Sequence, residues 1–332
     1  MRSVFYPRLV NDPFGDPALY VRLAHRREAL LFDCGELHRL APREVLKIRA
    51  VFISHAHIDH LAGFDTLLRL LLYREGNLLL YGPAGIAAQM AGRLASYTWN
   101  LTESYPFSLT VREWRPEGGR QVTFPARGAF RPENEGPWSA PDGVLLETGH
   151  FRVRTVPLDH GGIVSLAFAL EEPLHVAIHK DALERLGYAP GPWLTGFKDR
   201  LRCGEGEEAP VAVPLAAGGE KAIPLGRLAA TIAHPERGMK IAYVTDVAPT
   251  AANLEKIADL AVAADLLAIE APFAHADLDR ARERNHLTAR LAGELARRAG
   301  AARLLVFHHS PRYQDEPERL AEEARRAFSA QH

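Results

Sequence analysis

Residues 51–61 read VFISHAHIDHL, an apolar run that leads directly into three histidines and one aspartate. The apolar part is typical of a buried β-strand, and the polar residues begin where that strand ends. Because an extended backbone sends alternate side chains to one side, we expect His55 and His57 to reach the same point. Asp59 and His60 follow on the turn and can reach a second point nearby. The stretch therefore predicts a segment that holds two metal ions.

Three further apolar strands are predicted to end in residues of the same kind. His160 follows TVPLD, Asp246 ends AYVTD, and His308 follows LLVF. Imidazoles suit a borderline metal such as zinc, and one carboxylate can bridge two ions roughly 3.5 to 4 Å apart. We therefore interpret Asp246 as the bridging ligand. His309 is expected to point the other way along its strand and is left out of the site.

Short apolar runs bounded by turn residues alternate with helical patterns along the whole chain, which predicts an α/β fold. Strands are expected within residues 18–24, 29–35, 49–55, 77–82, 108–114, 151–158, 164–171, 239–246, 265–271 and 302–309. Helices are expected within residues 63–75, 83–97, 253–264, 286–300 and 317–330.

Two stretches interrupt this alternation. Residues 125–143 are rich in proline and glycine and are predicted to be an insertion. Residues 180–214 contain PGPW and a run of mixed charge and are predicted to form an arm-like excursion. Because strands resume after each stretch, neither is interpreted as a domain linker, and a single domain over residues 1–332 is expected.

Composition sets limits on compartment and partners. The chain has 332 residues, a formal net charge of -1 and 47% hydrophobic residues, so a nucleic-acid partner would require a local basic patch. Two cysteines, Cys34 and Cys203, are too few for a disulfide framework, and neither is interpreted as a ligand. With no signal peptide and no apolar stretch of about 18 residues, we expect a cytoplasmic protein without a membrane partner.

SHAHIDH resembles the signature of the metallo-β-lactamase superfamily. The resemblance implies an αββα sandwich, with two mixed sheets, helices on the outer faces and a dinuclear site. DLLAIEAPF, RNHLTARLAGELARRAGA and LLVFHHSPRY, with PLDHGG before them, resemble the ribonuclease Z family, endonucleases that remove 3′ trailers from precursor tRNA. These motifs stand in the family's order, and the resemblance covers most of residues 18–315.

The resemblance assigns the ligands to two metal ions. One ion would be held by His55, His57 and His160, the other by Asp59, His60 and His308, with Asp246 shared between them. Zinc is the expected metal, and the same ligands also accept manganese or iron. A homodimer is a further implication of the resemblance.

The resemblance also implies roles in catalysis and substrate binding. Asp59 would orient or deprotonate the attacking water, His286 would aid proton transfer to the leaving group, and Glu270 would be its acidic partner. Ser310 and Arg312 match positions that contact phosphate. From local sequence alone, a helix cap or a surface histidine is the favoured interpretation of His286, and the catalytic role rests on the resemblance.

The leading hypothesis is a metal-dependent phosphodiesterase of ribonuclease Z type that acts on precursor tRNA. Residues 269–272 read IEAP where the family has His-Glu-Ala-Thr, a departure expected to lower the rate or shift the substrate. Two alternatives follow: a hydrolase of a small phosphodiester or ester on the same scaffold, and a metal-containing RNA-binding protein with weakened catalysis. The stretch around Pro190 resembles the arm that grips tRNA, but its mixture of charges also fits an ordinary surface loop.

Overall fold

The computed structural model describes residues 4–24 and 26–330, and the fold divides into two compact units. Unit 1 comprises Met1–Leu145, Arg154–Ala169 and Lys240–His332, and unit 2 comprises Leu146–Val153 and Leu170–Met239. The single domain expected over residues 1–332 stays a prediction, and residues 1–3, 25 and 331–332 lie outside the described residues.

The first sheet carries the segment VFISHAHIDHL. Within the described residues it has eight strands in chain order, β1 (Phe5–Leu9), β2 (Leu19–Leu23), β3 (Ala29–Phe32), β4 (Ile48–Phe52), β5 (Gly76–Pro83), β6 (Phe107–Trp114), β7 (Gly119–Pro125) and β8 (Glu133–Trp138). Strands β3 to β6 are parallel, and the neighbours on either side of them are antiparallel. A short helix, α1 (Pro42–Val45), precedes β4.

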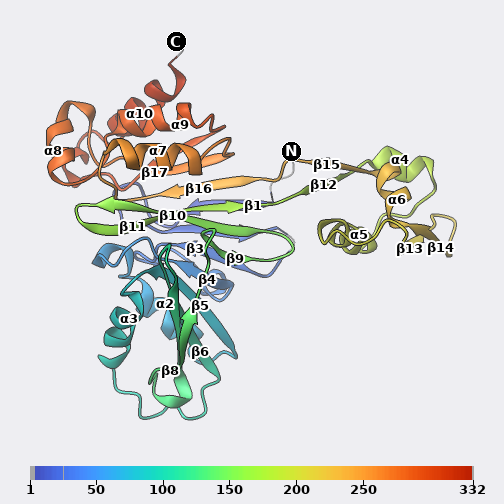
Figure 1. Ribbon diagram of the computed structural model, residues 1–332, viewed down its shortest axis with the longest axis horizontal. Coiled ribbons are helices and arrows are strands. Elements are labelled where there is room, and N and C mark those ends of the chain that lie inside the picture. The colour runs from blue at the N-terminus through green and yellow to red at the C-terminus, as the bar shows by residue number, and fades with distance from the viewer. Residues whose placement is uncertain (1–3, 25, 331–332) are drawn as a thin grey trace. The chain divides into compact units, whose positions relative to one another are not determined.

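Helices cover the outer face of this sheet (Figure 1). Parallel strands need crossover connections, and α2 (Phe64–Leu71) and α3 (Ile86–Ala95) supply them between β4 and β5 and between β5 and β6. Their apolar stripes, which include Phe64 and Met90, are buried in one core cluster with residues of the sheet.

The second sheet contributes most of the remaining site residues. Its order within the described residues is β18-β17-β16-β11-β10-β9. The bounds are β9 (Val144–Glu147), β10 (Arg152–His160), β11 (Ile163–Glu171), β16 (Lys240–Val244), β17 (Leu266–Glu270) and β18 (Leu304–Phe307). Strands β16, β17 and β18 are parallel, so their carboxyl ends meet at one edge.

The outer face of the second sheet is also covered by helices (Figure 1). These are α7 (Ala251–Leu260), α9 (Ala289–Arg298) and α10 (Arg319–Ser329), with α8 (Leu278–Glu283) before α9. Ile257, Leu295 and Leu320 from the three longer helices share a buried core with the sheet. Two mixed sheets with outer helices confirm the predicted αββα architecture.

Aromatic side chains fill the space between the two sheets. Phe52 stacks on Phe32 with ring centroids 5.0 Å apart. Phe168 from β11 of the other sheet lies 5.8 Å from both of these rings, and Tyr243 from β16 lies 5.9 Å from Phe32. Burial of such large apolar surfaces is the main source of the sandwich's stability.

Unit 2 has a small core of its own. It contains the antiparallel pair β12 (His175–Ile178) and β15 (Ala233–Glu236), and the hairpin β13 (Pro210–Pro214) and β14 (Glu220–Pro224). Its helices are α4 (Lys180–Arg185), α5 (Trp193–Arg202) and α6 (Leu225–Ile232). Leu183, Phe197 and Leu228 are among the residues buried in this core.

Both stretches that interrupt the predicted alternation contain regular structure. Residues 180–214 include α4, α5 and β13, and residues 125–143 include a 3-10 turn, η2 (Ala126–Gly128), and strand β8. Their status as an excursion and an insertion stays a prediction. None of the helices among the described residues combines the length and apolar character needed to cross a membrane.

Replacing Phe168 by Ala is expected to lower the free energy of unfolding by about 3 to 5 kcal/mol, because it removes a fully buried ring that contacts the opposite sheet. Urea unfolding monitored by tryptophan fluorescence would measure the loss. Ile163→Ala on the same strand is the control, since Ile163 is 41% exposed and its truncation should cost within about 0.5 kcal/mol. Equal losses in the two variants would contradict the proposed inter-sheet core.

Candidate metal centre and active site

The segment after β4 turns sharply and places its polar side chains in one cluster. His55 and His60 are almost fully buried, and a 3-10 turn, η1 (Ile58–His60), brings Asp59 and His60 round beside them. The ring centroids of His55 and His57 lie 4.4 Å apart, and those of His55 and His60 lie 4.2 Å apart. The alternation expected from an extended backbone thus places His55 and His57 together.

Asp246, two residues after the end of β16, lies between two sets of histidines. Its Oδ2 is 3.6 Å from Nε2 of His55 and 3.7 Å from Nε2 of His160. Its other oxygen, Oδ1, is 3.6 Å from Nε2 of His60 and 2.8 Å from Nδ1 of His308. One carboxylate therefore offers one oxygen to each set, which is the geometry that a bridging ligand requires.

The donor atoms form three overlapping groups, and within each group they lie within 4.8 Å of one another. The groups are His55, His57, His160 and Asp246; Asp59, His60 and His308; and Asp246, Glu270, His286 and His308. The structure thus brings together all seven residues predicted to be metal ligands. Imidazole and carboxylate donors at this density fit divalent metal ions.

Hydrogen bonds to the far ring nitrogens orient two of these histidines. Nδ1 of His160 donates to the carbonyl oxygen of Asn285 at 2.9 Å, and Nδ1 of His60 donates to Oδ2 of Asp33 at 2.9 Å. Each bond leaves Nε2 directed at the cluster, as in metal-ligating histidines. Nε2 of His60 is buried without a hydrogen-bond partner among the described residues, which fits a nitrogen reserved for an ion.

The electrostatic environment differs between the two sets of histidines. Burial lowers the pKa of His55 to about 2, with repulsion from His60 acting in the same direction. Burial alone would also lower the pKa of His60, but Asp33 and Asp246 outweigh it and hold that pKa well above its usual range. The imidazole of His55 is therefore already neutral before a metal binds, whereas that of His60 must lose a proton when a metal binds.

Glu270 and His286 form a pair beside the cluster. Nδ1 of His286 lies 2.7 Å from Oε2 of Glu270, which is fully buried at the end of β17. The other carboxylate oxygen accepts hydrogen bonds from the backbone N–H groups of Leu287 and Val247. Burial would lower the pKa of His286, but the charge of Glu270 and its hydrogen bond raise it, so the imidazole is well suited to carry a proton.

Asp33 is a site residue that the sequence analysis missed. It follows β3, is fully buried, and accepts hydrogen bonds from the backbone N–H and hydroxyl of Ser54 at 2.7 and 2.9 Å. The hydroxyl of Tyr243 donates to Oδ2 of Asp33 at 2.9 Å. The available signal was an aspartate after an apolar strand, the same pattern that identified Asp246.

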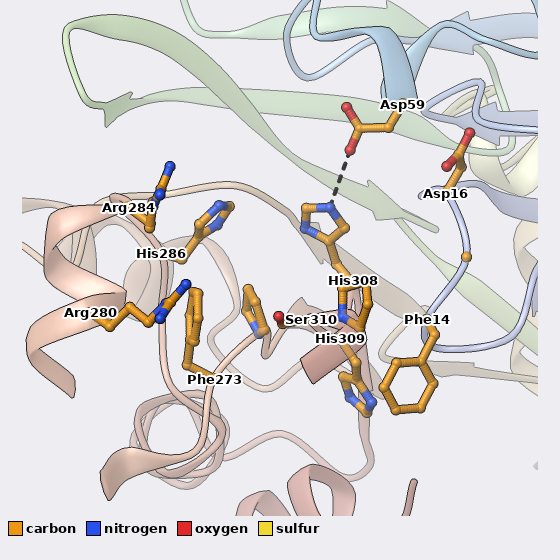
Figure 2. Close-up of a pocket in the computed structure, with 13 residues that line it drawn as sticks. Phe14, Asp16, Asp59, Phe273, Arg280, Arg284, His286, His308, His309 and Ser310 are labelled. Carbon is orange, nitrogen blue, oxygen red and sulfur yellow. Dashed lines mark hydrogen bonds and ion pairs between the residues drawn. The ribbon is translucent and has the colours of Figure 1, made fainter. Parts of the chain in front are cut away.

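A pocket of about 410 Å³ opens beside the cluster, and Figure 2 shows the residues around it. Asp59, His286 and His308 line it together with Ser310, which begins the 3-10 turn η4 (Pro311–Tyr313). Arg312 is not among the lining residues, and its guanidinium lies 4.0 Å from Asp277. The predicted phosphate contacts of Ser310 and Arg312 stay predictions.

Ile269 and His309 are adjacent in sequence to Glu270 and His308, but both are buried away from the metal cluster. Ile269, where the resembling family has histidine, is fully buried in the apolar core that α7 and α9 share with the sheet. Successive strand residues point to opposite faces, so Ile269 points away from the face on which Glu270 meets His286. His309 is buried with its ring edge-on to Phe14 at 5.2 Å.

Known proteins resemble this chain in sequence and fold. Residues 28–191 match the family model described as beta-lactamase superfamily domain. A protein of Deinococcus radiodurans named Ribonuclease Z is 34% identical over 312 residues, 92% of this chain and 90% of that protein. A metallo-β-lactamase fold protein from Bacillus subtilis has a TM-score of 0.56 at 17% identity, over 98% of this chain and 92% of its own. Human tRNase Z, short form, has a TM-score of 0.50 at 18% identity, over 93% of both chains.

Replacing Asp246 by Ala is expected to release metal from both positions, because among the residues that the structure describes it is the only carboxylate that offers an oxygen to each set of histidines. Metal content per chain after dialysis, measured by plasma mass spectrometry, would show the loss. Asp159→Ala is the matched control, since that exposed carboxylate accepts the backbone N–H of Gly162 and is outside the cluster. Two ions retained by Asp246→Ala would contradict the shared ligand.

Proposed function

Because the chain belongs to the ribonuclease Z family, whose members are metal-dependent hydrolases of the metallo-β-lactamase fold, we propose that it removes 3′ trailers from precursor tRNA. The observation that carries this proposal is the Glu270–His286 pair, joined at 2.7 Å, in the same pocket as Asp59 and His308. A proton donor beside a cluster of metal ligands is what hydrolysis of a phosphodiester requires.

The proposed ligand sets are two of the donor groups, and Asp246 belongs to the first and reaches His60 and His308 of the second with its Oδ1. One ion would be held by His55, His57, His160 and Asp246, and the other by Asp59, His60, His308 and Asp246. Bound divalent ions lower the pKa of a water molecule toward neutrality and offset charge on phosphoryl oxygens. We propose zinc because imidazoles dominate the donor set, and manganese or iron would suit the carboxylates.

The chain's own groups divide the proton transfers between them. Asp59 lines the pocket, and its side chain is 33% exposed, so it can accept a proton from the attacking water. His286 is held by Glu270 through Nδ1, which leaves Nε2 to donate a proton to the leaving 3′ oxygen. Ser310 lines the same pocket, which supports its proposed contact with the phosphate, and Arg312 is proposed for that role from the family resemblance.

The intact Glu270–His286 pair speaks against the hypothesis of an RNA-binding protein with weakened catalysis. Ile269 lies in the apolar core, and the pair is complete without a histidine at that position. A cytoplasmic location and a homodimeric state are parts of the proposal that rest on the sequence and the family resemblance.

Incubation of the metal-loaded protein with a 3′-extended precursor tRNA is expected to give one cut at the trailer junction. The trailer should carry a 5′ phosphate and the tRNA a 3′ hydroxyl, because the attacking water adds to phosphorus and the 3′ oxygen leaves. Mapping of the ends at nucleotide resolution, with and without a chelator, would check this. A protein with bound metal that cuts small phosphodiesters and leaves the precursor intact would refute tRNA processing.

Replacing His286 by Ala is expected to lower the cleavage rate by roughly 10² to 10⁴, the usual contribution of a general acid, while both ions stay bound. Single-turnover kinetics and metal analysis of the same preparation would separate the two effects. His38→Ala is the control, because the side chain of His38 is 64% exposed and pairs with Glu36 outside the site. A rate equal to that of the unmodified protein would remove His286 from proton transfer.

A further inference from the structure

The pocket beside the metal cluster extends well past the atoms that the proposed reaction uses. Phe14, Asp16, Phe273, Arg280 and Arg284 line it together with Asp59, His286 and His308. Its volume of about 410 Å³ is sufficient for a nucleotide as well as the scissile phosphate. The part of the pocket away from the metal ligands therefore takes no part in the proposed proton transfers or metal binding.

Two arginines form the cationic side of this pocket. Arg280 lies on α8 and Arg284 directly follows it, so the two side chains are four residues apart and lie on one face. Neither forms an ion pair with a carboxylate among the described residues, whereas Arg282 between them lies 3.7 Å from Asp279 and does not line the pocket. Two unneutralised guanidiniums on one face are suited to bind a phosphate.

The charges in the pocket are divided between its two sides. Figure 2 shows Arg280 and Arg284 on the same side as His286, and Asp16 and Asp59 on the other. A phosphate group outside the metal cluster is thus attracted to the arginine side and repelled from Asp16. We therefore expect an anionic ligand to bind with its phosphate on the side of the two arginines.

The position of His286 indicates which nucleotide enters. The imidazole must face the leaving 3′ oxygen, so the nucleoside that carries this oxygen lies on the same side of the scissile phosphate. Phe273 lies on that side with its ring centroid 6.1 Å from that of His286, and Phe14 contributes a second aromatic wall. Aromatic faces stack on nucleobases of any sequence.

We propose that this pocket binds the last nucleotide of the mature tRNA, with its base against Phe273 or Phe14 and its 5′ phosphate held by Arg280 and Arg284. The inference rests on the proposed function, because it places the leaving nucleoside beside His286. A nucleoside 5′-monophosphate, which has a free 3′ hydroxyl, is the smallest ligand with this chemistry.

The first test is equilibrium binding of adenosine 5′-monophosphate to the metal-loaded protein by calorimetry, with adenosine as the uncharged comparison. The double variant Arg280→Gln, Arg284→Gln should bind the monophosphate roughly 10 to 100 times more weakly, the usual range for lost charged hydrogen bonds. Binding of adenosine should not change. Arg282→Gln is the matched control and should bind both ligands as the unmodified protein does.

Two results of this test would overturn the proposal. Equal affinity for the monophosphate in all three proteins would place its phosphate away from the arginines. The absence of binding at millimolar concentration would show that the pocket does not accept a nucleotide.

A second test uses cleavage and determines which phosphate the arginines hold. A neutral methylphosphonate at the linkage one nucleotide 5′ of the cut should lower kcat/KM about tenfold or more for the unmodified protein. It should cause little further loss in the double variant, because the charge partner is already absent. Equal losses of kcat/KM in the unmodified protein and the double variant would overturn the assignment. It would also be overturned if the loss depended on the two arginines only for a methylphosphonate placed 3′ of the cut.

The two tests separate this inference from the proposed function. Arginine-dependent binding of the monophosphate without any cut in precursor tRNA would refute tRNA processing and leave the nucleotide subsite standing. A correct cut combined with arginine-independent binding and no coupling would refute the subsite and leave the function standing.

Discussion

The buried carboxylate of Asp33 is the group on which both the sandwich and the metal centre depend. It accepts hydrogen bonds from Ser54 and His60 after β4 of the first sheet and from Tyr243 on β16 of the second. A buried carboxylate is stable only when such donors surround it, and loss of one partner from a buried charge pair costs about 3 to 5 kcal/mol. Because Asp33 both joins the sheets and fixes the tautomer of His60, a change at this position would disturb fold and site together.

Backbone conformation adds a second constraint at the same edge of the sheets. Asp33 and His308 have φ values of 53° and 60°, a left-handed region that costs side-chain-bearing residues about 1 to 3 kcal/mol. The turn at His308 directs its ring to within 2.8 Å of Asp246, while the next residue, His309, is buried against Phe14. These two strained conformations are retained because the packed strands on either side fix the direction of the backbone at both residues.

The ligands could be predicted from sequence because their signal is local. Each strand core is apolar, and its first polar residues fall at the carboxyl end, so a pattern of a few residues indicates both the strand and the ligand. Asp33 has the same local pattern, but its importance depends on Tyr243, 210 residues away, and no local pattern carries that information. The strands of unit 2 were missed because they are only four or five residues long and several contain proline.

Strand alternation also explains why isoleucine at position 269, where the family has histidine, leaves the Glu270–His286 pair intact. Adjacent strand residues face opposite sides, so Glu270 and Ile269 cannot both face the cluster, and the carboxylate that pairs with His286 takes the inward position. An apolar residue at 269 then suits the core it joins. Glu270 and His286 therefore meet without help from the position at which this chain departs from its family.

Charge balance links metal binding to substrate binding. Asp59, Asp246 and Glu270 place three carboxylates at the centre, which by themselves would repel a phosphodiester. Two divalent ions would contribute four positive charges and reverse the sign at the scissile phosphate, so recognition of that group must depend on metal occupancy. Arg280 and Arg284 carry their charge independently of metal. A chain with a formal net charge of -1 can thus bind a polyanion, because the metal ions and the two arginines place positive charge at the positions proposed for the phosphates.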